Sequence, residues 1–97
     1  MAQQYLITAY DFTDSEALER RMAARPFHLD AIRKFKNTGN FIIGGAILNP
    51  EGKMIGSSLI MQFESEAELQ QWLEKDPYYT RKVWDKINIK PFRVAEI

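Results

Sequence analysis

The order of strand-like and helix-like segments is the feature that most constrains the fold of this chain. Residues 5–10 are rich in aromatic and β-branched side chains, residues 41–48 are apolar throughout, and residues 57–63 and 87–94 also have strand character. After the first strand and again after the third, apolar residues recur at the three- and four-residue spacing of a helix. Asn49–Lys53 is a strong turn sequence, so the two middle strands are expected to form a hairpin. The predicted order is therefore β-α-β-β-α-β.

That order within one domain is typical of the ferredoxin-like split β-α-β arrangement. We expect a single α+β domain over residues 1–97, with a four-stranded antiparallel sheet and both helices on one sheet face. The first three strands carry apolar residues on both faces, which two helices cannot cover. Because an exposed apolar patch of that size marks an interface, we expect a homodimer through the open sheet face, a dimeric α+β barrel.

Capping patterns predict where the two helices begin. Thr13 with Glu16, and Ser65 with Glu68, have the spacing of a capping box. In that motif a hydroxyl and a carboxylate bond the free backbone N–H groups of the first turn. The inner stripes of the later helical segments are expected to consist of Leu29, Ile32 and Phe35, and of Leu69, Trp72 and Leu73.

Pro26 is predicted to break the first helical segment in two. Proline lacks an N–H donor and disfavours helical geometry in the residue before it. The first part is expected to bury Leu18 and Met22 and to turn Arg21 to water, and the second part to run from Pro26 to Gly39.

The composition argues against several classes of function. Thirteen basic and thirteen acidic residues cancel, so no long-range field attracts nucleic acid or an anionic membrane. The chain has no cysteine, which excludes disulfides, thiolate nucleophiles and zinc–thiolate sites. Its single histidine and scattered acids form no metal-ligand cluster, and phosphate-loop and dinucleotide motifs are missing. We therefore expect no metal and no cofactor.

The apolar segments of the chain are short. None approaches the roughly 20 residues that a membrane helix needs. Residues 1–4 also lack the basic and apolar regions of a secretion signal. A cytoplasmic location is the expectation.

Two proline-marked corners contain the residues best suited to chemistry. Arg25–His28 includes the only histidine, and Asp76–Tyr78 begins 48 residues after it. Histidine gains and loses a proton near neutral pH, so His28 is a candidate general acid/base. Asp76 is a candidate to orient the ring and stabilise the imidazolium. Each has a structural alternative, because His28 could pack at a helix start and Asp76 could cap the turn beginning at Pro77.

Three further residues are candidate ligand contacts. The guanidinium of Arg25 suits a carboxylate or phenolate, although a surface ion pair is an equal alternative. Gly44-Gly45 would let a ligand approach the backbone at Gly45, or would mark a bulge or tight sheet packing. Tyr78, with Phe27 and Trp84, would line a pocket for a planar molecule or belong to the core.

Five short motifs follow one another along the chain: Arg25-Pro26-Phe27-His28-Leu29, Gly39, Gly44-Gly45, Asp76-Pro77-Tyr78 and Lys90-Pro91-Phe92. Together they resemble the YCII-related (YciI-like) proteins over nearly the whole chain. The resemblance implies a ferredoxin-like fold, a dimeric α+β barrel, and a cleft centred on His28 and Asp76. A dehydrochlorinase of a chlorinated hydroxyquinol looks like a relative, and the muconolactone isomerases share the barrel architecture. Phe27 departs from the smaller residue of the pattern and is expected to narrow the pocket.

The leading hypothesis is a small, cofactor-independent enzyme with a lyase or isomerase outcome. It would use His28 and Asp76 to move protons on a small cyclic or aromatic organic acid. The alternative is a dimeric module that binds a small ligand without turnover and holds His28 in its core. RNA-binding domains share the element order, but zero net charge and the lack of a matching aromatic pattern disfavour that function. Ser57 and Ser58 lack a nucleophile motif and are assigned no chemistry.

Overall fold

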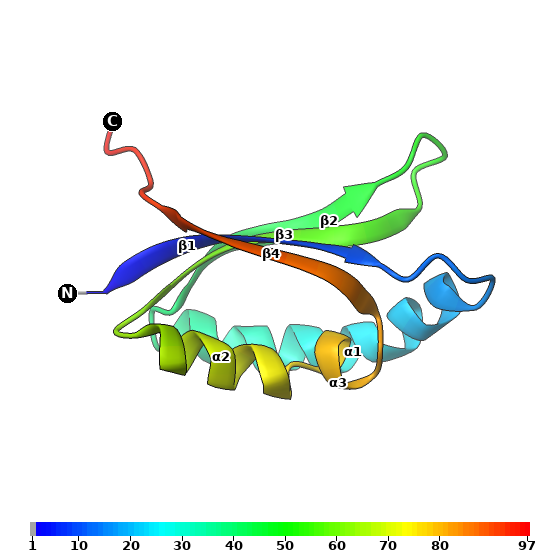
Figure 1. Cartoon of the computed structure of the whole chain (residues 1–97), viewed down its shortest axis with the longest axis horizontal. Coiled ribbons are helices and arrows are strands. Elements are labelled where there is room, and N and C mark those ends of the chain that lie inside the picture. Colours follow the sequence, from blue (N-terminus) through cyan, green and yellow to red (C-terminus); the bar gives the residue numbers. More distant parts are fainter. Residues whose placement is uncertain (1) are drawn as a thin grey trace.

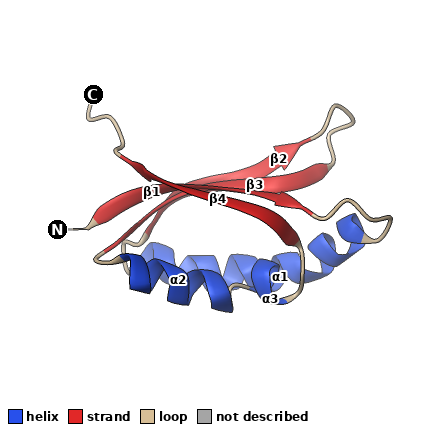
Figure 2. Cartoon of the chain, in the orientation of Figure 1, coloured by secondary structure: helices blue, strands red, loops and turns tan. Residues whose placement is uncertain are grey.

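A four-stranded antiparallel sheet forms one layer of the molecule, and helices cover one of its faces (Figures 1 and 2). This computed structural model describes residues 2–97. The elements in chain order are β1 (Gln3–Asp11), α1 (Ala17–Asn37), β2 (Phe41–Leu48), β3 (Met54–Phe63), α2 (Glu66–Lys75), α3 (Pro77–Thr80) and β4 (Trp84–Phe92). The predicted element order and α+β fold class are confirmed.

The strands lie in the order β2-β3-β1-β4, which places the N-terminal strand inside the sheet. β2 has the predicted bounds, whereas β3 begins three residues before the predicted strand. β4 begins at Trp84, earlier than expected, because its pairing with β1 extends to Asp11, and it ends at Phe92, opposite Gln4. Pro91 lies on this edge strand, where a residue without an N–H is tolerated.

The core lies between the sheet and the helices. Alternate residues of β1 and β3 point toward the helices, as the period of a strand requires. The predicted inner stripe of α2 is buried, and Ser65 caps this helix by accepting from the Glu68 N–H, as predicted. The strand and α2 side chains that form the centre of the core are Tyr5, Ile7, Ala9, Leu59, Met61, Phe63, Leu69, Trp72 and Leu73.

Helix α1 continues without a break through Pro26, so the predicted break is wrong. The proline removes one backbone hydrogen bond and crowds the carbonyl four residues earlier. The buried face nevertheless continues on both sides of it, with Ala24 before the proline and His28 and Ile32 after it. Packing of this face on the sheet outweighs the local cost. As a result, His28 lies in the middle of a helix rather than near its start.

The beginning of α1 also differs from the prediction. Glu16 occupies the N-cap position without a side-chain cap, so the predicted capping box with Thr13 is wrong. The carboxylate of Asp14 instead accepts from the Glu16 N–H at 3.2 Å and pairs with Arg20 at 2.8 Å. Asp14, two residues before the N-cap, therefore stabilises the first turn of α1.

Before Pro26, the buried face of α1 is not the predicted one, whereas after it Ile32 is buried and Phe35 packs against the core as predicted. Leu18 and Met22 are 37% and 48% exposed, whereas Arg21 is 2% exposed. The helix is turned so that Arg21 reaches Asp11 at the end of β1. A prediction from apolar spacing alone misses this orientation, because the residue that points inward is charged.

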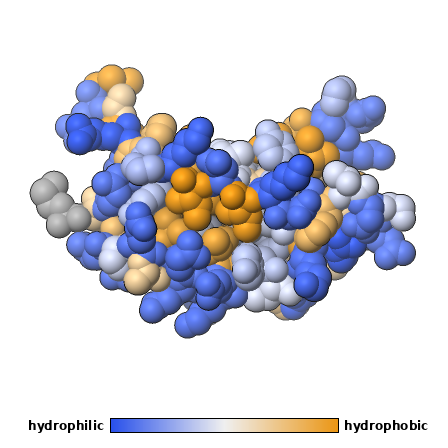
Figure 3. Space-filling view, viewed as in Figure 1, coloured by the Kyte–Doolittle hydropathy of each residue, from blue (hydrophilic) through white to orange (hydrophobic). Residues whose placement is uncertain are grey.

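The sheet face opposite the helices retains apolar side chains. Leu6, Ile60 and Ile43 are register neighbours across β1, β3 and β2, and Ile43 is 62% exposed. On the side seen in Figure 3, apolar surface also gathers between β4 and the helices, where Ile87 and Ile89 are half-buried against the core. Within residues 2–97, no helix is long and apolar enough to cross a membrane.

Candidate functional site

A cavity of about 160 Å³ lies between α1, the β2–β3 hairpin and α3. Four of the five predicted site residues line it, and the fifth, Asp76, lies behind the ring of His28. The lining residues are Arg21, Arg25, His28, Leu29 and Ile32 from α1, Phe41 and Gly44–Ala46 from β2, Ser57 and Leu59 from β3, and Tyr78 from α3. A larger hollow of about 440 Å³ lies between α1 and α2 and reaches Asp76 from the other side, without His28 in its lining.

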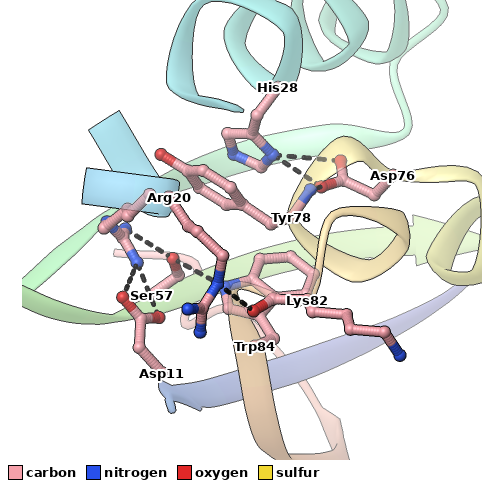
Figure 4. A network of polar contacts seen from close by, with 9 residues as sticks. Asp11, Arg20, His28, Ser57, Asp76, Tyr78, Lys82 and Trp84 are labelled. Atoms are coloured by element: carbon pink, nitrogen blue, oxygen red, sulfur yellow. Dashed lines mark hydrogen bonds and ion pairs between the residues drawn. The ribbon is translucent and has the colours of Figure 1, made fainter. Parts of the chain in front are cut away.

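The two proline-containing segments, Arg25–His28 within α1 and Asp76–Tyr78 after α2, meet at the imidazole of His28 (Figure 4). Its Nδ1 lies 2.8 Å from Oδ2 and 3.0 Å from Oδ1 of Asp76, and both side chains are almost fully buried. An ionised carboxylate only accepts hydrogen bonds, so Nδ1 carries a proton and donates it to this pair. In the neutral ring this assignment leaves the lone pair on Nε2.

The carboxylate of Asp76 makes both of the contacts considered for it, one with His28 and one with the backbone at the start of α3. Oδ2 also accepts from the backbone N–H of Tyr78 at 2.9 Å, which caps α3. The residue before Pro77 is held in extended geometry, which ends α2 and turns the carboxylate toward α1. The backbone donor and the ring therefore fix the same carboxylate.

The other nitrogen of His28 borders open space. Among the described residues, two buried side-chain nitrogens, Arg21 Nε and Trp72 Nε1, have neither contact with solvent nor a hydrogen-bond partner. His28 Nε2 has no protein partner either, but unlike those two nitrogens it keeps accessible surface. His28 lines the cavity. Tyr78 holds the ring by stacking on it at 4.0 Å between centroids, with 15° between the planes.

Arg21 and Ser57, two members of a second polar cluster, line the same cavity, and the sequence reasoning missed them. Arg21 donates to both oxygens of Asp11 at 2.9 and 3.0 Å and to Ser57 Oγ at 2.8 Å. Trp84 Nε1 also donates to Ser57 Oγ, at 3.1 Å. One signal was available, because Arg21 precedes His28 by seven residues and so shares its helix face. Trp84 itself belongs to the core.

The charges around the cavity favour an anionic ligand. Burial raises the pKa of the Tyr78 phenol, so this group is neutral and can donate a hydrogen bond at physiological pH. Arg25 is half-buried, lines the cavity and has no ion-pair or hydrogen-bond partner among residues 2–97. Burial raises the pKa of the Asp11 carboxyl, while the guanidinium of Arg21 acts in the opposite direction.

The glycine pair and Phe27 play different parts. A Cβ on Gly44 would lie 3.1 Å from Ser58 O, so close sheet packing explains that glycine. A Cβ on Gly45 would meet nothing within 4 Å, which leaves this stretch of backbone open beside the cavity.

Phe27 is 52% exposed, with the guanidinium of Arg81 4.2 Å from its ring centroid. The expected narrowing of the pocket by Phe27 is therefore wrong, because one residue before His28 the side chain points away from the sheet.

Fold and site together define a ferredoxin-like protein with a buried histidine–aspartate pair beside a small cavity. Residues 3–93 match the YCII-related domain, and the chain belongs to this family. It is 34% identical over 95 residues to Protein YciI of Escherichia coli, a match that covers 92% of this chain and 95% of that protein. An uncharacterised protein of Haemophilus influenzae is 30% identical over 97 residues, with the same two coverages.

Solved structures share the fold. The 5-chloro-2-hydroxyhydroquinone dehydrochlorinase TftG of Burkholderia phenoliruptrix, in complex with 2,5-dihydroxybenzoquinone, superposes with a TM-score of 0.81. Its sequence identity is 24%, over 95% of each chain. A dimeric ferredoxin-like protein from an uncultured marine organism has a TM-score of 0.57 and 15% identity, over all of this chain and 92% of that one. Within residues 2–97, no three His, Cys, Asp or Glu side chains group as metal ligands.

Proposed function

We propose that this protein is a cofactor-independent enzyme that moves protons on a small cyclic or aromatic organic acid, with a lyase or isomerase outcome. The observation that supports this function is the 2.8 Å contact between His28 Nδ1 and Asp76, with Nε2 left open toward a cavity. TftG, whose fold is similar, is named for the removal of hydrogen chloride from an aromatic substrate.

The proposed mechanism assigns one role to each residue. Nε2 of His28 takes a proton from an acidic carbon or hydroxyl and later returns it to another atom. Asp76 keeps the ring in the correct tautomer and stabilises the imidazolium while it carries the proton. Arg25 binds a carboxylate or phenolate of the substrate, Tyr78 lines the cavity beside the substrate, and Gly45 leaves room for the ligand.

Two assays test catalysis on this class of compound. The first measures chloride release from 5-chloro-2-hydroxyhydroquinone, and the second measures hydrogen–deuterium exchange at the ring carbons of 2,5-dihydroxybenzoquinone in heavy water. We expect the native chain to accelerate at least one of these reactions over buffer. Tight binding of both compounds without acceleration of either would contradict the proposal.

That outcome would favour the second candidate, a dimeric binding module without turnover. The observation on its side is the burial of His28, which is only 6% exposed. In such a module the histidine–aspartate pair positions a ligand and transfers no proton.

The open sheet face supports a homodimer packed sheet to sheet. Ile43 and Ile60 pair across β2 and β3 on this face, and Ile43 is the more exposed of the two. We expect the native chain to have the mass of a dimer in light scattering and Ile43→Lys to have the mass of a monomer. Met22→Lys, on the outer face of α1, is the control and should stay dimeric. A monomeric native chain, or a dimeric Ile43→Lys variant, would refute this assembly.

A further inference from the structure

We propose that Ser57 is a substrate-binding residue that donates a hydrogen bond to the ligand oxygen on which negative charge develops. The site would then take six-membered rings with a carbonyl or phenol oxygen, which form enolates or phenolates. This inference rests on the proposed function and names the substrate group that the His28 chemistry requires. The Ser57 hydroxyl lies in the cavity wall and is buried.

The direction of the Ser57 hydroxyl follows from its partners. A serine oxygen has two acceptor sites and one proton to donate. Both acceptor sites are used, one by Arg21 at 2.8 Å and the other by Trp84 at 3.1 Å. The Ser57 proton has no acceptor among the described residues. A buried hydroxyl that accepts twice and donates to nothing is prepared for an acceptor that the ligand supplies.

The neighbouring groups make this end of the cavity a site for a negatively charged oxygen. Tyr78 contributes a neutral phenol, and its hydroxyl has no acceptor among residues 2–97. The ring of Tyr78 contacts Arg21, with 4.6 Å from its centroid to the guanidinium carbon, and stacks on His28 at 4.0 Å. Ser57, Arg21, Tyr78 and His28 therefore form a continuous series of contacts in the cavity lining.

The cavity size limits the ligand to one ring. Its volume is about 160 Å³, and an apolar protein cavity of about 150 Å³ accommodates benzene. When Nε2 removes a proton from the carbon beside a carbonyl, the C–H electron pair forms the enolate double bond and the carbonyl π pair moves to oxygen. The Ser57 hydroxyl bonds that oxygen and keeps its own proton, so it stabilises charge without taking part in the transfer.

Equilibrium binding of two probes tests the assignment. One probe is 4-nitrophenol at a pH where it is ionised, and the other is nitrobenzene, which lacks the charged oxygen. We expect Ser57→Ala to weaken 4-nitrophenolate binding by about 10- to 100-fold, the worth of a hydrogen bond to a charged group. Nitrobenzene binding should change by less than about twofold in the same variant. Ser58→Ala, on the opposite face of β3, is the matched control and should affect neither probe.

Equal weakening of both probes would overturn the proposal, because the hydroxyl would then serve only to hold Arg21 and Trp84. Undiminished phenolate binding would overturn it as well. If Ser57→Ala does not fold, the native protein provides a second measurement. The Ser57 hydroxyl proton should shift downfield in NMR spectra on addition of 4-nitrophenolate and not of nitrobenzene, and an unmoved resonance would refute the assignment.

Neither binding nor the NMR shift requires turnover. The Ser57 hydrogen bond and the proposed catalysis by His28 can therefore be refuted independently of each other. A lost Ser57 effect beside intact His28-dependent exchange overturns this inference alone. An intact Ser57 effect without any exchange overturns the proposed catalysis alone.

Discussion

Replacing His28 by glutamine is expected to lower the rate of substrate proton exchange by about 10²- to 10⁴-fold, the usual contribution of a general acid/base. Glutamine is similar in size, and its amide can still donate to Asp76, so the buried carboxylate keeps a partner. What the variant loses is the nitrogen lone pair that faces the cavity. The rate is measured by hydrogen–deuterium exchange on 2,5-dihydroxybenzoquinone.

Phe27→Ala is the matched control for His28→Gln. It removes the neighbouring side chain, which points out of the fold and does not line the cavity. We expect it to retain the native rate. A His28→Gln variant that is as fast as the native chain would exclude the imidazole as the base.

Replacing Arg21 by methionine is expected to reduce the free energy of unfolding by about 3–5 kcal/mol, because it leaves the buried Asp11 without its counter-charge. The side chains of Arg21 and Asp11 are 2% and 5% exposed, so water cannot compensate for the loss. Ser57 also loses one of its two donors. Urea unfolding at neutral pH measures the difference.

Arg20→Met is the comparison for Arg21→Met. Arg20 pairs with Asp14 at a side-chain exposure of 33% and 49%, where water screens the two charges, so we expect a much smaller loss of stability. Equal losses in the two variants would mean that the buried cluster contributes no more than a surface pair.

The loss in the free energy of unfolding caused by Arg21→Met is also expected to depend on pH. Burial raises the pKa of Asp11 in the folded protein. A folded-state pKa above the unfolded value means that stability is retained below the unfolded pKa and falls as the pH rises through the folded one. Without Arg21 the folded-state pKa of Asp11 rises further. The loss in the free energy of unfolding of Arg21→Met should therefore become smaller as the solution is acidified.

Local patterns were sufficient to predict the arrangement of the elements. The strand-like composition of residues 41–48 and the cap formed by Ser65 involve neighbours along the chain, and both agree with the structure. Pro26 was misjudged because the cost of a proline is local, whereas the gain from packing α1 on the sheet is spread over its whole buried face.

The sequence alone was sufficient to identify only part of the site. His28 and Asp76 stood out because each follows a chemical rule for its residue type, and their proline neighbours drew attention to both. Arg21 and Ser57 did not, because a helical arginine and a strand serine are ordinary residues until a fold removes them from water. Their significance comes from partners 10 and 36 residues away.

The tautomer of His28 tests the central claim most directly. Nitrogen-15 NMR distinguishes a protonated from an unprotonated imidazole nitrogen, and it needs no substrate. In the native chain at neutral ring charge we predict the proton on Nδ1 and the lone pair on Nε2. In Asp76→Asn, whose amide can donate to Nδ1, we predict a shift of the proton toward Nε2. A native ring protonated on Nε2, or a tautomer that does not respond to Asp76→Asn, would contradict the account.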